Sequence, residues 1–361
     1  MLRRRVLFAA AAVLSVNLAG LGWDTARAAA PGHLPSRLGD QEFWALVTDL
    51  SEPGGSFRSD NLLSNESRLQ LVIPDLVKTV PRGGVYIGVG PEQNFTYIAA
   101  LQPSMAFIVD IRRGNLQLHL MYKALFELSA DRADFVSRLF SRKVPDDLRA
   151  SSTALEIFDA YSNVDPSEAL YARNLNAIET HLVSRHGFAL SSDDLKGIAY
   201  VYHAFYAFGP GINYSSSESN TGSGGNRPTY ADLMMATDGT GHARSYLASE
   251  DAFATVKALQ TKNLVVPVVG DFAGSKAVRA VGAYLTRKDA IVSAFYVSNV
   301  EQYLRLERVW GSFCANAARL PMDEASQFIR AGRGGRYSRG TALTAELSPI
   351  AVEVEGCDRR P

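Results

Sequence analysis

The 361-residue sequence lacks several features that would identify a class of protein directly, and each absence excludes something. Only two cysteines are present, which excludes a disulfide-rich scaffold, and no paired-cysteine metal motif occurs. The 37 basic and 37 acidic residues give a formal net charge of zero, which removes the electrostatic case for a nucleic-acid partner. After residue 30 no apolar run approaches a membrane span, and no internal repeat is visible. Walker loops and Gly-x-Ser-x-Gly elbows are also missing.

The first thirty residues do follow a familiar pattern. Met1 to Arg5 is a cationic start, Val6 to Gly22 is apolar and small, and Thr25 to Ala30 supplies the small residues of a cleavage site. This pattern is typical of a secretory signal peptide over residues 1–30, cleaved after Ala28 or Ala30, and it predicts a periplasmic or secreted protein. The alternative is a single N-terminal membrane anchor, for which the apolar core is short.

The two cysteines, Cys314 and Cys357, both lie in the predicted mature chain. In an oxidising compartment such a pair is a candidate disulfide. A bridge would tie the C-terminal tail to the helix around Trp310, which is predicted to run from Glu301 to Ala318. Closing a loop of this length would contribute about 4 kcal/mol. The alternative is two buried thiols in unrelated places.

Short apolar runs alternate with helical patterns along the chain. This alternation favours a three-layer α/β/α, Rossmann-like fold with a mainly parallel sheet covered on both faces. The predicted strands are a run from Val85, Ala106–Asp110, Asn263–Asp271 and Ala290–Asn299, with Phe328–Arg330 and Ile350–Val354 as closing strands.

A largely helical block from about residue 115 to 262 separates the second predicted strand from the third. We interpret it as an insertion that elaborates one sheet, so that residues 31–361 form a single domain. Its expected helices cover 131–142, 152–161, 167–185 and 192–207. Within it, residues 210–228 are rich in Gly, Ser and Asn and predict a mobile loop, either a lid or a disordered segment.

The most informative segment runs from Gly84 to Gln93 and continues to the strand ending at Asp110. It predicts a strand, a glycine turn, a helix and a second strand that ends in a carboxylate. Gly88 and Gly90 permit a tight turn and a close approach of the backbone to a ligand. Asp110 follows at the distance where a carboxylate accepts from both hydroxyls of a ribose. We predict a nucleoside site here; the alternative is a plain glycine turn with Asp110 capping the next helix.

Three further polar residues follow the later strands: Asp271 after the third, and Asn299 and Glu301 after the fourth. Ligands of open α/β sheets bind at the carboxyl ends of the strands, so we expect a small-molecule ligand in a cleft at this edge. Asp271 has a rival role as N-cap of the helix predicted from Ser275, and Asn299 and Glu301 share that ambiguity.

Charged residues beside the nucleoside motif leave alternatives open. Arg112 and Arg113 either neutralise a carboxylate of the ligand or flank a solvated helix start. Glu92 either caps the helix after the glycine turn or contacts a ligand.

No metal site is predicted. His181 and His186 lie five residues apart, which is the wrong spacing for two ligands on one helix face. His242 lies in a glycine-rich turn that we interpret as a surface loop, with a position at the border of the cleft as the alternative.

The sheet segments resemble class I S-adenosylmethionine-dependent methyltransferases. The family's glycine motif matches Gly88-Val-Gly90 and its ribose-binding acid matches Asp110. The resemblance implies S-adenosylmethionine as cofactor, an adenine contact at Asp271, and substrate and methyl-group contacts at Asn299. Two positions depart from the motif: Tyr86 stands where the family has an acid, and Glu92 stands where it has a third glycine.

A closer resemblance covers most of residues 40 to 335. The stretches IGVGPEQNFTYIAALQPSMAFIVDIRRGNLQLHLMYKALFELSADR and FYVSNVEQYL look like a bacterial family of uncharacterised, methyltransferase-like proteins. Two hypotheses follow. The first is an exported methyltransferase-like enzyme of unknown substrate. The second is a non-catalytic periplasmic ligand-binding protein on a degenerate methyltransferase fold, because S-adenosylmethionine is made inside the cell and is scarce outside it.

Overall fold

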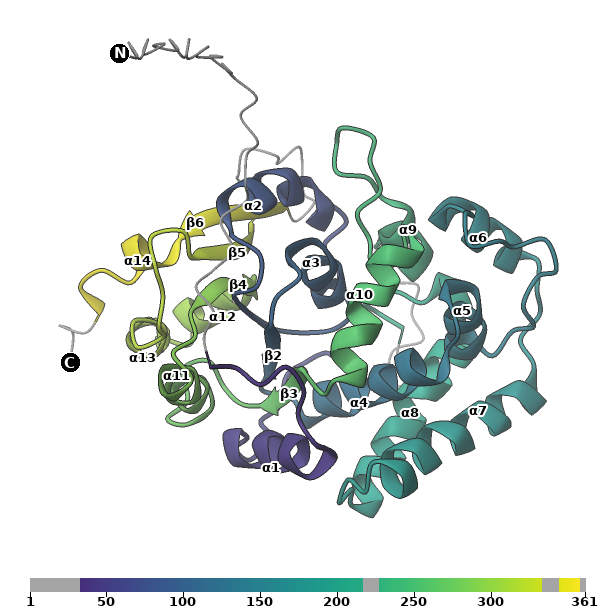
Figure 1. The fold of residues 1–361 in the computed structure, drawn as a ribbon, viewed down its shortest axis with the longest axis horizontal. Helices are drawn as coiled ribbons and strands as arrows, with labels where there is room; N and C mark the ends of the chain where they lie inside the picture. Colours follow the sequence, from purple (N-terminus) through teal and green to yellow (C-terminus); the bar gives the residue numbers. More distant parts are fainter. Residues whose placement is uncertain (1–32, 217–226, 333–343, 358–361) are drawn as a thin grey trace, which may run out of the picture.

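A six-stranded sheet forms the centre of the computed structural model, which describes residues 33–216, 227–332 and 344–357 (Figure 1). The strand order is β3-β2-β1-β4-β5-β6, with the first five strands parallel and β6 antiparallel to β5. The strands are β1 (Val85–Gly88), β2 (Met105–Asp110), β3 (Val265–Val269), β4 (Val292–Ser298), β5 (Gln327–Gly332) and β6 (Thr344–Pro349). This confirms the predicted α/β fold with a mainly parallel sheet.

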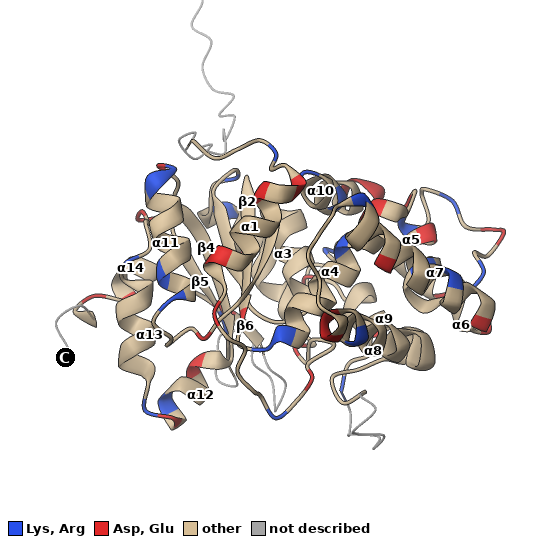
Figure 2. Ribbon diagram, turned by 90° about the horizontal axis from the view of Figure 1, so that it is seen from below, with Lys and Arg blue, Asp and Glu red and all other residues tan. Residues whose placement is uncertain are grey.

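Helices cover both faces of the sheet, which explains why its inner strands are continuous apolar runs. Every residue of β1, β2 and β3 is buried. In Figure 2 the sheet lies between α11 and α13 on one side and α3, α4 and α10 on the other. The helices outside the insertion are α1 (Asp40–Leu50), η1 (Leu69–Val72), α2 (Ile73–Thr79), α3 (Gln93–Leu101), α11 (Ala277–Arg287), α12 (Val300–Leu306), α13 (Trp310–Ala317) and α14 (Ile350–Glu353).

The helical insertion lies between β2 and β3, as predicted. Its first and last helices, α4 and α10, pack on each other, while α5 to α7 extend away from the sheet at the right of Figure 1. The members are α4 (Arg113–Leu128), α5 (Arg132–Phe140), α6 (Ala154–Ser162), α7 (Glu168–Thr180), η2 (His181–Arg185), α8 (Ser192–Phe208), η3 (Gly209–Gly211), α9 (Tyr230–Met235) and α10 (Glu250–Thr261).

Side-chain caps fix where several insertion helices begin. Thr153, Ser191 and Thr229 each accept from the backbone amide three residues on, and an acidic residue there reaches back to the cap. Such capping boxes satisfy two of the amides that a helix start leaves without partners. The central part of the glycine- and serine-rich segment predicted as a mobile loop, residues 217–226, lies outside the described residues.

Two predicted elements near the C-terminus are wrong. The strand expected over Ile350–Val354 is the short helix α14, and the closing strand β6 precedes it. Pro349 ends β6 and starts the helix with a φ of −60°, and within α14 only Ile350 is buried. The single helix expected from Glu301 to Ala318 is divided into α12 and α13, where Arg308 adopts a left-handed φ of 62°.

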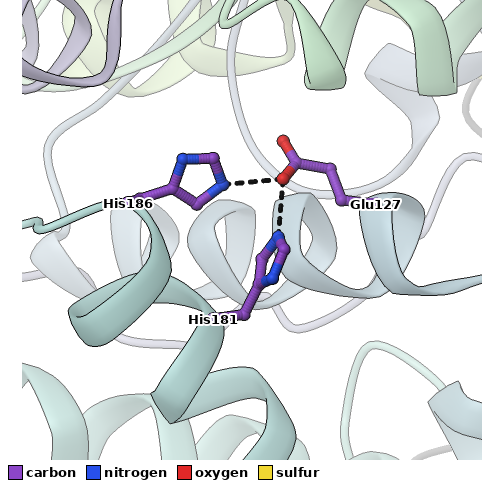
Figure 3. Close-up of side chains that lie close together, drawn as sticks. All are labelled: Glu127, His181 and His186. Atoms are coloured by element: carbon purple, nitrogen blue, oxygen red, sulfur yellow. Dashed lines mark hydrogen bonds and ion pairs between the residues drawn. The ribbon is translucent and has the colours of Figure 1, made fainter.

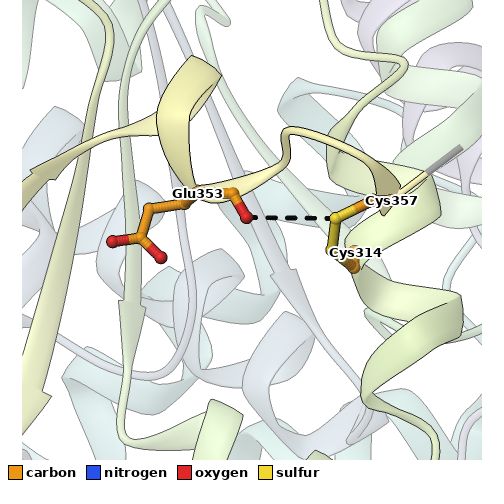
Figure 4. Close-up of a disulfide and its surroundings, with 3 residues drawn as sticks. All are labelled: Cys314, Glu353 and Cys357. Carbon is orange, nitrogen blue, oxygen red and sulfur yellow. Dashed lines mark hydrogen bonds between the residues drawn. A yellow bond between two sulfur atoms is a disulfide. The ribbon is translucent and has the colours of Figure 1, made fainter.

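The C-terminal tail is joined to α13 by a disulfide between Cys314 and Cys357 (Figure 4). The two Cα atoms are 5.4 Å apart, within the usual range for a disulfide. Of the two alternatives for the cysteines, the bridge is therefore the one that forms. A disulfide is consistent with an extracytoplasmic location.

The predicted signal peptide lies outside the described residues. Within the part of the chain that is described, no helix combines the length and the apolar character needed to cross a membrane. Acidic and basic residues are interspersed over the ribbon in Figure 2, in keeping with the formal net charge of zero.

Candidate functional site

A cavity of about 190 Å³ opens at the carboxyl edge of the sheet, where β1 and β4 lie side by side. From β1 the chain proceeds to β2 on one side, and from β4 it proceeds to β5 on the other. This is the switch point at which open α/β sheets bind ligands. Four residues predicted from the sequence line the cavity together: Gly90, Asp110, Asp271 and Asn299.

The glycine turn after β1 is closed by the side chain of Asn94, on the first turn of α3. Its Nδ2 donates to the carbonyls of Val89, Gly90 and Pro91 at 2.7–3.1 Å. Gly90 has a φ of 77°, which favours glycine. Gly88 lies under the turn, where a Cβ would collide with Asn94 and Tyr86. The turn is thus held by internal bonds before any ligand binds.

Tyr86, in β1, supports this turn. Its hydroxyl donates to Oδ1 of Asn94 at 2.9 Å, and its side chain is fully buried. The residue therefore orients Asn94 and, through it, the turn.

Asp110 is already paired with an arginine two residues along. Its Oδ1 accepts from the backbone amide and Nε of Arg112, both at 2.9 Å, and its Oδ2 accepts from Nη2 at 2.7 Å. A carboxylate offers about four acceptor positions, so about one remains for a ligand. Asp110 can therefore accept hydrogen bonds from both hydroxyls of a ribose only if Arg112 moves.

The alternatives for the neighbouring charges are also decided. Asp110 does not cap α4, because the amide that it binds belongs to Arg112, the residue before the helix. Arg112 neutralises Asp110 and also donates to the carbonyl of Asp60. Arg113 points elsewhere and forms a two-bond ion pair with Asp194 of α8, at 2.6 and 2.8 Å. Neither arginine stands unpaired in the cavity.

Asp271 lines the cavity and does not cap the next helix. Its Oδ1 accepts from the amide of Ala273 at 2.9 Å, whereas α11 begins after Lys276. Its own amide donates to Oε1 of Glu52 at 2.8 Å, which holds the segment after α1 against the end of β3. The N-cap alternative for this residue is therefore wrong.

Asn299 and Glu301 separate at the end of β4. Asn299 lines the cavity and occupies the N-cap position of α12 without a side-chain cap bond. Glu301 lies away from the lining and pairs with Arg330 of β5 at 2.9 Å. Burial raises the pKa of Glu301, and the charge of Arg330 opposes that rise. Of the two residues predicted to contact substrate, Asn299 lines the cavity and Glu301 does not.

Glu66 is the main cavity residue that the sequence did not indicate. Its Oε1 accepts from the hydroxyls of Tyr296 and Ser298, each at 2.5 Å, and its side chain is 1% exposed. Ser298 has a left-handed φ of 52°, a strained backbone of the kind that collects at functional sites. Burial raises the pKa of Glu66, and the two hydroxyl donors counter this in part.

Beneath the glycine turn lie two more buried ionisable groups. Burial raises the pKa of Glu92 to about 8, against the effect of the Ser64 amide, which donates to both of its oxygens at 3.3 Å. Glu92 stands at the N-cap of α3 without a side-chain cap bond. His119 of α4 places Nε2 2.9 Å from the carbonyl of Gly90, and burial lowers the pKa of His119 to about 4. A neutral imidazole there donates its Nε2 proton to the turn.

Several acceptors on cavity-lining residues have no hydrogen-bond partner among the residues that the structure describes. Oε2 of Glu66, Oε1 of Gln93 and Oδ1 of Asn61 are buried without a hydrogen bond. A buried acceptor without a donor costs about 1–3 kcal/mol. Hydroxyl or amino groups of a bound molecule would supply the missing donors. The aromatic rings of Phe57, Tyr214, Phe272 and Tyr303 provide apolar surface around these polar groups.

Comparison with protein families places most of the chain in a family. The model of a domain of unknown function (DUF7790) matches residues 62–192 and 223–347. These two segments include Glu66, Gly90, Asp110, Asp271 and Asn299. No curated protein matches the chain. Because the family model covers most of the sequence, the chain belongs to the DUF7790 family of domains of unknown function.

Proposed function

We propose that this protein binds a nucleoside-bearing small molecule in the cavity at the switch point, as an exported methyltransferase-like protein with S-adenosylmethionine as the first candidate ligand. One observation carries the proposal. Gly90, Asp110, Asp271 and Asn299 come from four different strand ends and line the same cavity. Ligands of open α/β sheets bind at this place.

The unpartnered acceptors of Glu66, Gln93 and Asn61 support a ligand rich in hydrogen-bond donors. A nucleoside with an amino-acid tail has hydroxyl, amino and ammonium groups of this kind. Asp110 keeps about one acceptor position for such a ligand while Arg112 holds the rest.

When bound, S-adenosylmethionine would supply an electrophilic methyl group, and its transfer to a nucleophile leaves a neutral thioether. The chain's contribution is mainly alignment of the two reactants. Glu66 is the candidate to accept a proton from the nucleophile, because its Oε2 is unpartnered among the described residues and burial raises the pKa of its carboxyl group above the usual value. Tyr296 and Ser298 would hold that carboxyl group in place through Oε1.

A second candidate function is ligand binding without chemistry, on a degenerate methyltransferase fold. The bond of Arg112 to Asp110 favours it, because this arginine occupies the acceptors that a ribose would use. Tyr86 and Glu92, in place of the family's acid and third glycine, point the same way.

Calorimetry and thermal unfolding of the purified protein with S-adenosylmethionine, S-adenosylhomocysteine, adenosine and methionine would test both candidates. A ligand at a hundred times its dissociation constant stabilises a protein by about 2.7 kcal/mol. We expect the adenosine-bearing ligands to raise the melting temperature and methionine to leave it unchanged. No response to any of them would contradict the nucleoside site.

Two variants sharpen the test. Asn299→Ala removes a lining side chain and should weaken binding, whereas Gln302→Ala, on the next helix but outside the lining, should leave it unchanged. Arg112→Gln frees acceptors on Asp110 and should tighten nucleoside binding if the arginine competes with the ribose. Binding without transfer of an isotopically labelled methyl group to a panel of small acceptors would favour the non-catalytic candidate.

A further inference from the structure

A second polar cluster lies away from the cavity, where α4 meets the end of α7 (Figure 3). Oε2 of Glu127 lies 2.6 Å from Nε2 of His181 and 2.7 Å from Nε2 of His186. Figure 3 shows both imidazoles directed at this one carboxylate. The three side-chain atoms lie within 4.8 Å of one another.

A π-helical turn brings the two histidines together. Residues His181–Arg185 form the turn η2, and the amide of His186 donates to the carbonyl of His181 at 3.0 Å. In an α-helix a spacing of five would separate the two rings, which is why the sequence predicted no shared face. That expectation is wrong, because the wider π turn aligns residues five apart. Such turns are rare and often occur at functional sites.

The second ring nitrogen of His186 is also held. Its Nδ1 lies 2.7 Å from Oδ1 of Asp40, and that same oxygen accepts from Nδ2 of Asn263 at 2.9 Å. The ring stacks on Phe188 with centroids 4.9 Å apart. A carboxylate on the far nitrogen of a histidine is the arrangement that orients metal-binding histidines and fixes their tautomer.

We propose that Glu127, His181 and His186 bind a divalent first-row transition-metal ion of the zinc class. Two imidazoles and one carboxylate suit such an ion, and three protein ligands leave one coordination position open. Binding would replace the two hydrogen bonds to Oε2 with three metal–ligand bonds, and the protons of those hydrogen bonds would leave the two Nε2 atoms, because a histidine binds a metal through an unprotonated nitrogen. The donor atoms would need to separate from 2.6–2.7 Å to about 3.3 Å, the distance between ligands around a tetrahedral zinc ion.

The surroundings permit that adjustment. Lys123 donates to Oε1 of Glu127 at 2.6 Å and so leaves Oε2 as the single coordinating oxygen. The side chain of His181 is 17% exposed, which gives an ion a route from solvent, whereas His186 and Glu127 are 7% and 8% exposed. The bound ion would join α4 to η2 within the helical insertion, and through Asp40 it would link the insertion to α1.

Metal content and affinity of the purified protein would test the proposal. We expect chelator-treated protein to bind one zinc ion per chain, retain it through desalting and melt at a higher temperature. Cobalt(II) should occupy the same site and give visible absorption bands of a four-coordinate ion. Protein that retains no zinc and shows no change in melting temperature would overturn the proposal and leave the cluster as an ion-pair network.

Variants locate the site. His181→Gln should weaken zinc binding roughly 100-fold or more, and Asp40→Asn roughly 10- to 100-fold, the usual cost of losing a group that orients a metal ligand. His33→Ala removes an exposed histidine far along the chain from the cluster and should change the affinity less than twofold. If His181→Gln fails to fold by circular dichroism, Glu127→Gln takes its place. Equal zinc binding by wild type and the folded ligand variant would overturn the assignment.

Discussion

Buried carboxyl groups lie both around the cavity and in the Glu127 cluster, but their hydrogen-bond donors differ in charge. In the cavity Glu66 accepts from neutral hydroxyls, beneath the glycine turn Glu92 accepts from a backbone amide, and burial raises the pKa of both. In the cluster burial also opposes ionisation of Glu127, but hydrogen bonds from His181 and His186 and the charge of Lys123 outweigh it. The pKa of Glu127 is therefore held well below its usual value.

This difference separates a receptive site from a fixed one. Cavity carboxyls with neutral partners can gain or lose a proton, and Glu66 keeps an unpartnered oxygen for a ligand. Both oxygens of the Glu127 carboxylate accept hydrogen bonds, so its charge serves to join helices or to hold a cation. Burial alone does not decide the state of a carboxyl group; the charge of its donors does.

The largest expected effect comes from removing the cluster's charge. Glu127→Gln in metal-free protein leaves the ammonium of Lys123, whose side chain is 2% exposed, without its carboxylate. Breaking a buried ion pair from one side costs about 3–5 kcal/mol, so we expect urea denaturation to give a loss of about 4 kcal/mol. The double variant with Lys123→Met should recover much of it. A loss below about 1 kcal/mol would mean that the pair is effectively solvated.

The next largest effect is a pH dependence of the free energy of unfolding that arises from Glu92, beneath the glycine turn. The pKa of Glu92 in the folded protein is about 8, above its usual value of 4.5, so the folded state keeps a proton that the unfolded chain releases. Its contribution to stability is complete below pH 4.5 and is lost as the pH rises to 8. At 1.36 kcal/mol per pH unit, the loss of stability between pH 4.5 and pH 7 amounts to about 3 kcal/mol.

Glu92→Gln keeps the shape and an acceptor for Ser64 but cannot ionise. We therefore expect the variant to gain on wild type in free energy of unfolding between pH 5 and pH 8. Urea denaturation at several pH values measures the difference. Parallel curves for the two proteins would show that Glu92 is not protonated in the folded state.

A smaller loss is expected at the Asp110–Arg112 pair. Asp110→Asn should cost about 2 kcal/mol, because Arg112 keeps the carbonyl of Asp60 and one amide oxygen as acceptors. The double variant Asp110→Asn/Arg112→Gln removes both charges and should cost less than Asp110→Asn alone. An additive result from the double-mutant cycle would mean that the two residues do not interact.

The smallest effect is expected at Tyr296. Tyr296→Phe removes one donor to Glu66, while Ser298 retains the other, so the free energy of unfolding should fall by about 1 kcal/mol. Tyr303→Phe removes an exposed hydroxyl that accepts from Arg58 and should cost less. Chemical denaturation of both variants gives the comparison, and a reversed order would contradict the role given to the Glu66 network.

The sheet and much of the cavity could be predicted because their determinants are local. β-branched runs marked β3 and β4, and the carboxyl ends of parallel strands must meet at one edge, so Gly90, Asp110, Asp271 and Asn299 could be grouped. The prediction for Glu301 depended on the strand end alone and did not anticipate its pairing with Arg330 on another strand.

The rest depended on contacts between distant segments or on rare backbone geometry. Glu66 lies 230 residues before Tyr296, in a segment without a regular pattern, so nothing in its spacing indicated the cavity. The period of an α-helix predicts that His181 and His186 do not share a face, and the π turn that brings them together cannot be recognised from their spacing. The strand predicted at Ile350–Val354 is wrong because its apolar composition fits a strand, whereas the preceding Pro349 ends β6 and begins α14.

Pro267, at the centre of β3, has a consequence for how the sheet ends. The carbonyl of Leu264 and the amide of Gly270 bond to β2, so the intervening odd-numbered residues turn their backbone groups toward the open edge. Val269 has its amide and carbonyl bonded to Ser51 and Glu52, and Pro267 has no amide to offer. An apolar edge strand that offers few amide donors is a poor template for another chain. The sequence Val-Val-Pro-Val-Val therefore protects the protein from edge-to-edge aggregation, at no cost to the ladder with β2.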